Sequence, residues 1–248
     1  QSNEIYCWGD DSEGQKSVPK DMQFSHVALG GYHVCALDLL GKAHCWGNND
    51  HAQSSPPADD FAQLALGQFV SCGLTTRGEV RCWGLNAWGL TLPPEGTFVD
   101  LDVGYDHACA LNLSGGAICW GNPVEEKTQD VAKSFNKIAC GGEHNCGVLQ
   151  SGRVECWGSN IHGQADTVLG IYLDVDAGGS NTCGLGVDET LTCWGIQEAD
   201  QSSDVLDAQT PEGSFVQIST GVNHACAVDD SGRIQCWGDN TSNQSFPP

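Results

Sequence analysis

Cysteine offers the most chemistry in this chain, because fourteen of its 248 residues are Cys. Twelve of them form six pairs with a fixed spacing of ten positions, and the second Cys of each pair begins a Cys-Trp-Gly triplet. Cysteines so arranged could bind zinc or oxidise to disulfides. The chain contains no Cys-x-x-Cys, the spacing typical of zinc sites, so the pattern favours disulfides. The predicted disulfide pairs are Cys35 with Cys45, Cys72 with Cys82, Cys109 with Cys119, Cys146 with Cys156, Cys183 with Cys193, and Cys226 with Cys236.

Histidine forms a second series, two residues before the first Cys of four pairs. Its members are His33, His107, His144 and His224. Histidines at equivalent positions of a repeat suggest a metal ring. Neighbouring repeats are normally too far apart, however, to share a coordination sphere with bonds of ~2.1 Å. We therefore expect no metal site here.

No other motif in the chain points to catalysis. Its carboxylates are scattered over loops, without a framing motif that would nominate a general acid and base. It has no Gly-x-Ser-x-Gly, no phosphate-cradling loop and no Asp-x-Asp-x-Asp-Gly calcium loop. We expect a protein that is not an enzyme and needs no cofactor.

The cysteine pairs recur with a period of 37 residues, lengthened to 43 before Cys226. Each repeat opens with an alternating segment closed by Gly, such as 24–30, which predicts a first β-strand. A second strand surrounds the first Cys and a third ends in the triplet. An antiparallel pairing of these two strands would place the two cysteines opposite each other. The predicted repeats are 24–57, 61–94, 98–131, 135–168, 172–205 and 215–248, with residues 1–20 as a partial unit or closing strand.

The turn between the second and third strands is marked by glycine six residues after the first Cys. Glycine adopts the left-handed conformation of such turns without strain. In the fifth repeat Glu189 occupies this position, which predicts either strain or a turn shifted to Asp188. The triplet tryptophans are expected to pack between neighbouring β units, with each indole N–H donating to a backbone acceptor. The turn glycines are Gly41, Gly78, Gly115, Gly152 and Gly232.

The composite pattern Gly-x-x-His-x-Cys-Ala-Leu, Gly turn, Cys-Trp-Gly-x-Asn-x-x-Gly-Gln resembles the regulator-of-chromosome-condensation repeat. The resemblance covers essentially the whole chain and implies an all-β propeller, residues 1–248 forming a single domain. It also implies a structural role for the histidine series, holding a turn. The short unit is most similar in style to the bacterial β-lactamase inhibitory proteins of this superfamily. The paired cysteines depart from both relatives and indicate an oxidising environment.

The number of blades stays open between two interpretations. Cys7-Trp8-Gly9 is a seventh triplet, but it has no partner cysteine ten residues upstream. The ring has six blades with residues 1–20 as an added strand, or seven with a closing hairpin missing or supplied by another molecule. The strand count favours six complete blades. Cys140 also lies outside the pairs, and we expect it to be a buried thiol.

The charge of the chain excludes some partners. Its 10 Lys and Arg oppose 32 Asp and Glu, for a net charge of −22, which repels nucleic acids and anionic membranes. No apolar run is long enough to cross a bilayer. A cationic protein surface is the favoured partner, although the acidity could also serve solubility alone.

Function in a propeller lies on a face made by loops from every blade. In the inhibitory relatives, the loop between the first and second strands carries aromatic contacts to the partner. Trp88 is a further candidate anchor, expected on another edge. We expect a secreted or cell-surface protein-recognition module. The alternatives are an assembly subunit joined through the N-terminal strand or Cys7, and a carbohydrate-binding propeller. The matching loop positions here are Tyr32, Phe69, Tyr105 with Asp106, Glu143, Ser180 and Asn223.

Overall fold

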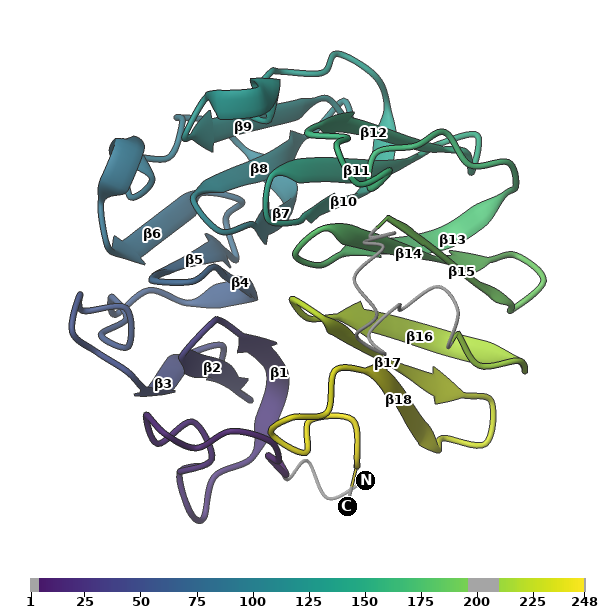
Figure 1. Ribbon diagram of the computed structural model, residues 1–248. Helices are drawn as coiled ribbons and strands as arrows, with labels where there is room; N and C mark the ends of the chain where they lie inside the picture. The colour runs from purple at the N-terminus through teal and green to yellow at the C-terminus, as the bar shows by residue number, and fades with distance from the viewer. Residues whose placement is uncertain (1–4, 196–209, 248) are drawn as a thin grey trace. The chain divides into compact units, whose positions relative to one another are not determined.

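The structure of this protein is a computed structural model that describes residues 5–195 and 210–247 (Figure 1). The chain forms two compact units. Unit 1 comprises Gln1–Pro123 and Thr128–Val131, and unit 2 comprises Val124–Lys127 and Ala132–Pro248. The predicted units 1–20, 172–205 and 215–248 extend in part outside the described residues. The expectation of a single domain stays a prediction.

Unit 1 contains three antiparallel sheets of three strands each, ordered along the chain (Figure 1). A short 3-10 helix, η1 (Ala87–Gly89), follows the second sheet. The strands are β1 (Phe24–Leu29), β2 (His33–Asp38) and β3 (Ala43–Gly47); β4 (Phe61–Leu66), β5 (Val70–Thr75) and β6 (Val80–Gly84); and β7 (Phe98–Val103), β8 (His107–Asn112) and β9 (Ala117–Gly121).

Unit 2 repeats this arrangement with three more antiparallel sheets. A second 3-10 helix, η2 (Val124–Glu126), belongs to this unit. The predicted three-strand repeat is therefore confirmed in all six cases. The strands are β10 (Phe135–Cys140), β11 (His144–Leu149) and β12 (Val154–Gly158); β13 (Tyr172–Ala177), β14 (Asn181–Gly186) and β15 (Leu191–Gly195); and β16 (Phe215–Thr220), β17 (His224–Asp229) and β18 (Ile234–Gly238). No helix in the described ranges is both long and apolar enough to cross a membrane.

A disulfide joins the second and third strands of every sheet, so the six predicted bridges are confirmed. Cys35 lies directly opposite Cys45 in the register of β2 and β3, with their Cα atoms 4.1 Å apart. The same register recurs in the other five sheets, where the Cα atoms of each pair lie 4.0 to 4.1 Å apart. These five bridges join Cys72 to Cys82, Cys109 to Cys119, Cys146 to Cys156, Cys183 to Cys193, and Cys226 to Cys236.

Two cysteines lie outside the six bridges. Cys7 is a half-buried free thiol. Cys140 is buried at the end of β10, which agrees with the expectation of a buried thiol. The six bridges therefore contain every cysteine that recurs in a pair, and the two cysteines without a partner in the repeat lie outside them.

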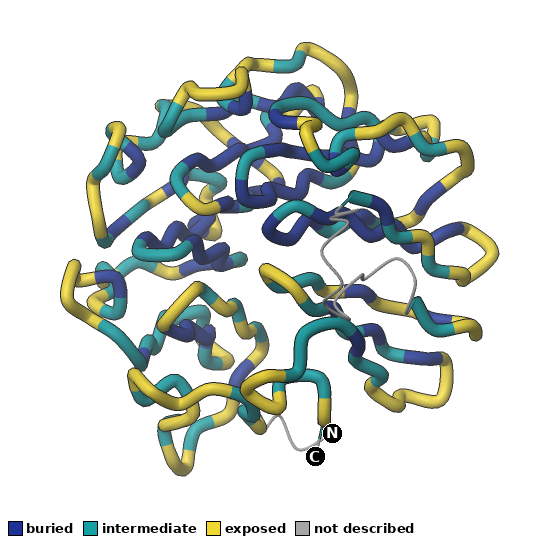
Figure 2. The backbone as a smooth tube through the Cα atoms, in the orientation of Figure 1, coloured by how far each residue is buried: buried dark blue, intermediate teal, exposed yellow. Residues whose placement is uncertain are grey.

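The buried residues lie mainly along the strands (Figure 2). Their side chains form clusters between successive sheets, and aromatic residues make up part of these clusters. Phe61, the first residue of β4, is buried and packs with its ring centroid 5.8 Å from that of Trp83 in β6. The same pairing recurs between Phe135 and Trp157 and between Tyr172 and Trp194. The indole of Trp83 donates to the carbonyl of Gln53 at 2.8 Å, so the predicted backbone acceptor is present. Equivalent bonds are Trp46 to Gln15, Trp120 to Leu90 and Trp194 to Gln164. The prediction is wrong for Trp157, whose buried indole N–H has no hydrogen-bond partner among the described residues.

The turns between second and third strands have the predicted left-handed residues. Gly41 has a φ of 81°, and the other four turn glycines have φ between 81° and 83°. In the fifth sheet the turn is not shifted to Asp188, because Glu189 itself adopts a φ of 66°. A non-glycine residue is thus held in a conformation that glycine fills at lower cost.

Candidate functional site

The loops between first and second strands are three residues long, and we call them the first loops. They are 30–32, 67–69 and 104–106 in unit 1, and 141–143, 178–180 and 221–223 in unit 2. Each is closed by a backbone hydrogen bond, such as that from Gly30 N to His33 O at 2.9 Å. The last residue of each first loop is the predicted contact position of that repeat, apart from Tyr105, which lies one residue earlier.

The triplet glycine fixes the segment that leaves each sheet against a first loop. Gly47 has a φ of 95°, and a Cβ there would lie 2.7 Å from the carbonyl oxygen of Tyr32. Any other residue would push the two backbones apart. Asn48 N then donates to Tyr32 O, and Leu85 N donates to Phe69 O, both at 2.9 Å. The exit loops that follow each triplet, such as 48–53 and 85–90, therefore lie at the same sheet edge as the first loops. We call this the first-loop edge.

Neighbouring first loops also contact each other within each unit. In unit 1, Gly31 N donates to Gly67 O at 3.2 Å, and a Cβ on Gly67 would lie 2.3 Å from Gly104 O. In unit 2, Gly142 N donates to Gly178 O at 2.9 Å. The loops of successive sheets are thus drawn into one continuous edge in each unit.

The first-loop edge of unit 1 carries an aromatic cluster of Tyr32, Phe69 and His51. The rings of Tyr32 and Phe69 stack with centroids 5.8 Å apart, and His51 meets Phe69 edge-on at 5.4 Å. Tyr32 is 39 % exposed. The structure thus brings together two residues predicted from the sequence and adds His51, which sequence reasoning missed. The sequence did contain a signal for His51, because it occupies the same position in its repeat as Trp88: both lie six residues after the second Cys of their pair.

Trp88 lies on an exit loop of the first-loop edge, which corrects the expectation that it marks another edge. The hydrogen bond from Leu85 to Phe69 starts this loop beside the first loop of the second sheet. Trp88 is 65 % exposed and has a φ of 56° within η1. A bulky residue in this region costs on the order of 1–2 kcal/mol relative to ordinary conformations. The loop thus holds a large apolar side chain in solvent at a conformational cost.

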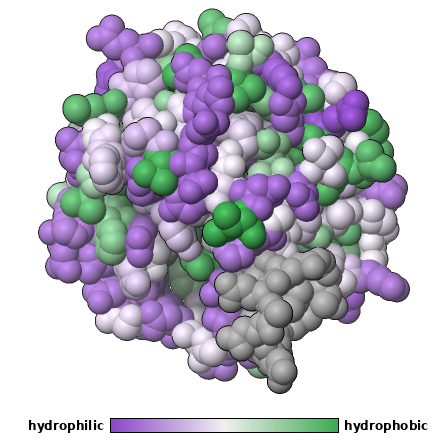
Figure 3. All heavy atoms as spheres, turned by 45° about the horizontal axis from the view of Figure 1, so that its top comes forward, coloured by the Kyte–Doolittle hydropathy of each residue, from purple (hydrophilic) through white to green (hydrophobic). Residues whose placement is uncertain are grey.

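Carboxylates flank the aromatic cluster. The side-chain amide of Asn48, next to Tyr32, donates to Glu13 and to Asp50, each at 3.0 Å. On the third sheet, Asp106 accepts a hydrogen bond of 2.6 Å from Asn122. Its neighbour Tyr105 is 37 % exposed. On the face drawn in Figure 3, hydrophilic residues likewise surround small separate hydrophobic patches.

The first-loop edge of unit 2 is polar at the predicted positions. Glu143 pairs with Lys127, whose side chain is fully buried while that of Glu143 is 45 % exposed. Ser180 is half-buried and Asn223 is exposed. The predicted contact residues thus fall into an aromatic group on unit 1 and a polar group on unit 2. Their combination into one binding face stays a prediction.

Two members of the histidine series, His33 and His144, connect successive sheets by side-chain bonds. His33 Nε2 lies 2.7 Å from Ser71 Oγ, and His144 Nε2 lies 2.7 Å from Thr182 Oγ1. The ring of His33 also fills the space above Gly30, where a Cβ would lie 2.5 Å from it. These histidines therefore have a structural role. Their imidazole rings bond to a hydroxyl of the next sheet, and the ring of His33 also packs against the first loop of its own sheet. Across the described ranges, no three His, Cys, Asp or Glu side chains gather as metal ligands would.

Comparison with known proteins relates the chain to one family. Five segments, 24–53, 61–87, 98–125, 135–164 and 215–244, match the Regulator of chromosome condensation (RCC1) repeat. The fifth predicted repeat lies outside these segments. Together with solved structures, this match shows the predicted all-β propeller fold, with a disulfide in each of six three-stranded sheets.

Two of the similar solved structures are receptor ectodomains from plants. The ectodomain of the Physcomitrella patens receptor kinase CR4 is 26 % identical, with a TM-score of 0.82 over 96 % of this chain and 68 % of its own. The CRINKLY WD40 ectodomain of the Arabidopsis thaliana receptor kinase ACR4 is 27 % identical, with a TM-score of 0.80 over 99 % and 89 %.

A third similar structure is yeast RCC1 (Prp20), solved with Kap60 bound. It is 19 % identical, with a TM-score of 0.78 over 96 % of this chain and 79 % of its own. These likenesses support the plant ectodomains and RCC1 as the structures this chain resembles. They do not support the bacterial β-lactamase inhibitory proteins that the repeat style suggested.

Proposed function

The chain belongs to the regulator-of-chromosome-condensation (RCC1) repeat family, and on that premise we propose that it is an extracellular, non-catalytic module that recognises another protein. The binding surface we assign is the first-loop edge of unit 1. The observation that carries the proposal is the stack of exposed Tyr32 on half-buried Phe69, flanked by carboxylates. Rigid aromatic side chains supply binding energy, and acids beside them steer a charged partner.

The extracellular location follows from chemistry and from relatives. Six disulfides in a chain of this length persist in an oxidising compartment and would be unusual in a reducing cytosol. The similar CR4 and ACR4 structures are themselves ectodomains. Both observations support a secreted or cell-surface protein.

The partner we propose is a protein with a basic surface. A net charge of −22 attracts cationic partners over several ångströms and speeds their association at low salt. Yeast RCC1, which shares this fold, has been solved with the protein Kap60 bound to it, which is consistent with a protein partner. In the proposed complex, the charge steers the encounter while Tyr32, Phe69 and Trp88 anchor it.

Capture from the extracellular fluid of the source tests this proposal. Three immobilised baits are compared without reductant: the unmodified protein, Tyr32→Ala/Phe69→Ala, and the control Val99→Ala/Leu113→Ala. Val99 and Leu113 are 57 % and 74 % exposed and lie at the opposite, turn end of the third sheet. A basic protein retained by the unmodified and control baits but lost from the double variant supports the proposal. Retention of glycans alone, or equal retention on all three baits, contradicts it.

A further inference from the structure

Three asparagines of the chain stand in an Asn-x-Ser tripeptide, the acceptor pattern for N-linked glycans on secreted proteins. They are Asn112, Asn240 and Asn243. A glycan is bulky and hydrophilic, so the folded protein accommodates one only where the side-chain nitrogen of the asparagine faces solvent. The structure separates the three residues on this point, because Asn243 is exposed while Asn112 and Asn240 are half-buried.

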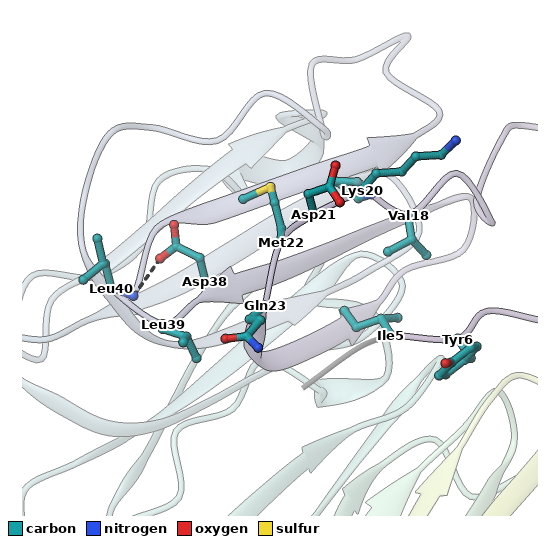
Figure 4. Close-up of a pocket in the computed structure, with 11 residues that line it drawn as sticks. Ile5, Tyr6, Val18, Lys20, Asp21, Met22, Gln23, Asp38, Leu39 and Leu40 are labelled. Atoms are coloured by element: carbon teal, nitrogen blue, oxygen red, sulfur yellow. Dashed lines mark hydrogen bonds between the residues drawn. The ribbon is translucent and has the colours of Figure 1, made fainter. Parts of the chain in front are cut away.

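Asn112 closes the turn of the third sheet. Its side-chain oxygen accepts hydrogen bonds from Ser114 N at 2.9 Å, from Ser114 Oγ at 2.6 Å and from Gly116 N at 3.0 Å. Asp38 occupies the equivalent position of the first sheet, where its carboxylate accepts from Leu40 N at 2.8 Å (Figure 4). Both polar residues of this tripeptide are therefore explained by the chemistry of the turn.

Asn240 closes the exit loop of the sixth sheet, residues 239–244. Its side-chain oxygen accepts from Ser245 N at 3.0 Å. The first sheet has the same bond in its exit loop, from Ser54 N to the side-chain oxygen of Asn49 at 2.9 Å. An asparagine at this position thus has a structural role that recurs between repeats.

Asn243 has no comparable role. Its side-chain amide has no hydrogen-bond partner among the described residues. Its backbone is left-handed, with a φ of 61°, as it is at the equivalent positions of other exit loops, where Ala52 has a φ of 64° and Gly163 one of 77°. The loop therefore needs a left-handed backbone here but no particular side chain. Asparagine tolerates this conformation better than most residues, and its amide is left in solvent.

The position of the loop sets where a group on Asn243 would lie. Asp239 N donates to Asn223 O at 2.8 Å, which holds the start of the exit loop against the first loop of the sixth sheet. Ser245 Oγ donates to Asp239 O at 2.7 Å and fixes its other end. Asn243 thus projects from the first-loop edge of unit 2, in the same loop that contacts the predicted contact residue Asn223.

We propose that Asn243 carries an N-linked glycan, and that this glycan keeps the neighbouring part of the first-loop edge of unit 2 in solvent. The inference rests on the proposed extracellular location, because N-linked glycans are found on secreted and cell-surface proteins. It removes Asn223 from the candidate protein-binding residues and leaves the aromatic cluster of unit 1 among them.

The modification is a group transfer from a lipid-linked oligosaccharyl diphosphate, catalysed by a transferase of the secretory pathway. The side-chain nitrogen of Asn243 forms a bond to the anomeric carbon of the first sugar. The bond from that carbon to the diphosphate oxygen breaks, and the lipid diphosphate leaves with the electron pair. The amide loses one proton to a base of the transferase, and no oxidation or reduction takes place.

Mapping the glycans of the protein purified from the extracellular fluid of the source tests this inference. After tryptic digestion, a peptide N-glycosidase in heavy-oxygen water converts each glycan-bearing asparagine into labelled aspartate, and fragment ions distinguish Asn240 from Asn243. We expect label at Asn243 in at least about tenfold excess over Asn112 and Asn240, because only its amide is exposed. Label mainly at Asn112 or Asn240, or none at any of the three, would overturn the inference.

Variants secreted from cultured eukaryotic cells give each tripeptide a matched control. Asn243→Gly removes the glycan acceptor and keeps the left-handed backbone. Ser242→Ala removes the tripeptide of Asn240 and leaves that residue in place, and Asn112→Asp keeps the turn closed as Asp38 does. We expect the intact mass to lose the glycan in Asn243→Gly and to retain it in the other two variants. Retention in Asn243→Gly would contradict the inference.

The result is independent of the protein-binding surface. A secreted protein with its six bridges but without a glycan on Asn243 overturns this inference and leaves the Tyr32–Phe69 surface untouched. Equal partner retention by Tyr32→Ala/Phe69→Ala contradicts the surface and leaves the glycan in place. A protein found only inside the cell, with reduced cysteines, overturns the extracellular location on which both rest.

Discussion

His33 and Ser71 belong to different sheets, yet the imidazole Nε2 and the hydroxyl oxygen lie 2.7 Å apart with both side chains fully buried. The Ser71 hydroxyl donates onward to Gln53 O at 2.9 Å, and the indole of Trp83 donates to the same carbonyl. One buried chain of hydrogen bonds thus joins the histidine of the first sheet to the triplet tryptophan of the second. It also holds the exit loop 48–53, which carries His51 of the aromatic cluster.

Replacing Ser71 should show what this connection contributes. Ser71→Ala leaves the buried imidazole without its hydroxyl partner, and we expect a loss of about 1–3 kcal/mol in the free energy of unfolding. Ser71→Thr is the matched control, because Thr182 makes the equivalent bond to His144. Urea unfolding followed by tryptophan fluorescence measures both. An alanine variant as stable as the threonine variant would contradict the structural role of the bond.

The burial of His33 predicts a loss of stability in mild acid. Burial lowers the pKa of His33 from 6.5 to about 4, so the unfolded chain binds a proton before the folded one does. The contribution of the neutral His33 side chain to the free energy of unfolding is complete above about pH 6.5, and it is lost as the pH falls towards 4. The full shift corresponds to about 3 kcal/mol. The His33 contribution is measured by comparing the urea midpoints of the unmodified protein and His33→Asn across this pH range. Asparagine is chosen because Asn181 occupies the same position in the fifth repeat. A variant with the same pH dependence as the unmodified protein would contradict the assignment.

Asp176 predicts a pH dependence of the opposite sign. Burial raises the pKa of this carboxyl from 3.8 to about 6, although the N–H groups of Thr220 and Ala177 donate to it. The folded chain therefore binds a proton first, and stability falls as the pH rises from about 4 to 6. Asp176→Asn should remove this fall, which is on the order of 1 kcal/mol after solvent screening. Thermal unfolding of both proteins at pH 4 and pH 7 measures this change in stability. Equal losses of stability between these pH values in both proteins would count against a raised pKa.

The turn of the fifth sheet offers a stabilising substitution. Glu189 has a φ of 66°, whereas the equivalent residues of the other turns are glycines. Glu189→Gly should raise the free energy of unfolding by up to about 1 kcal/mol, because glycine avoids the left-handed penalty. Gly152→Ala is the opposite control. It places a Cβ at a φ of 81° and 2.6 Å from Ile171, and should destabilise. A destabilised Glu189→Gly variant would show that the glutamate makes contacts worth more than the strain.

The sequence predicts the strands and bridges well because their signals are local and repeated. Alternating apolar residues, the turn glycine and a fixed cysteine spacing act within one repeat, so Cys35 and Cys45 could be paired without knowing any neighbour. The bond from His33 to Ser71 was not predictable in this way. Its second partner lies one repeat later, at a position that varies among Val34, Ser71, Ala108, Asn145, Thr182 and Ala225.

The candidate site was predicted in part for the same reason. Tyr32 and Phe69 occupy a repeated position, so their placement on neighbouring first loops followed from the repeat. Trp88 lies in an exit loop that departs from the Asn-x-x-Gly-Gln pattern, and its left-handed φ has no counterpart in that pattern. The hydrogen bond between Leu85 and Phe69 shows that the loop carrying Trp88 starts at the first-loop edge. That bond joins the loops at the ends of two strands of the sheet, and local sequence does not encode it.

The affinity of the captured partner for two double variants tests the central claim most directly. The claim is that the stacked pair of Tyr32 and Phe69 anchors a protein partner at the first-loop edge. Isothermal titration at physiological salt should give a Kd at least about 30-fold weaker for Tyr32→Ala/Phe69→Ala, because two central aromatic anchors are removed. The control Val99→Ala/Leu113→Ala should remain within about twofold of the unmodified protein. A weakened control together with an unchanged Tyr32→Ala/Phe69→Ala variant would contradict the account and place the binding surface at the turn end of the sheets.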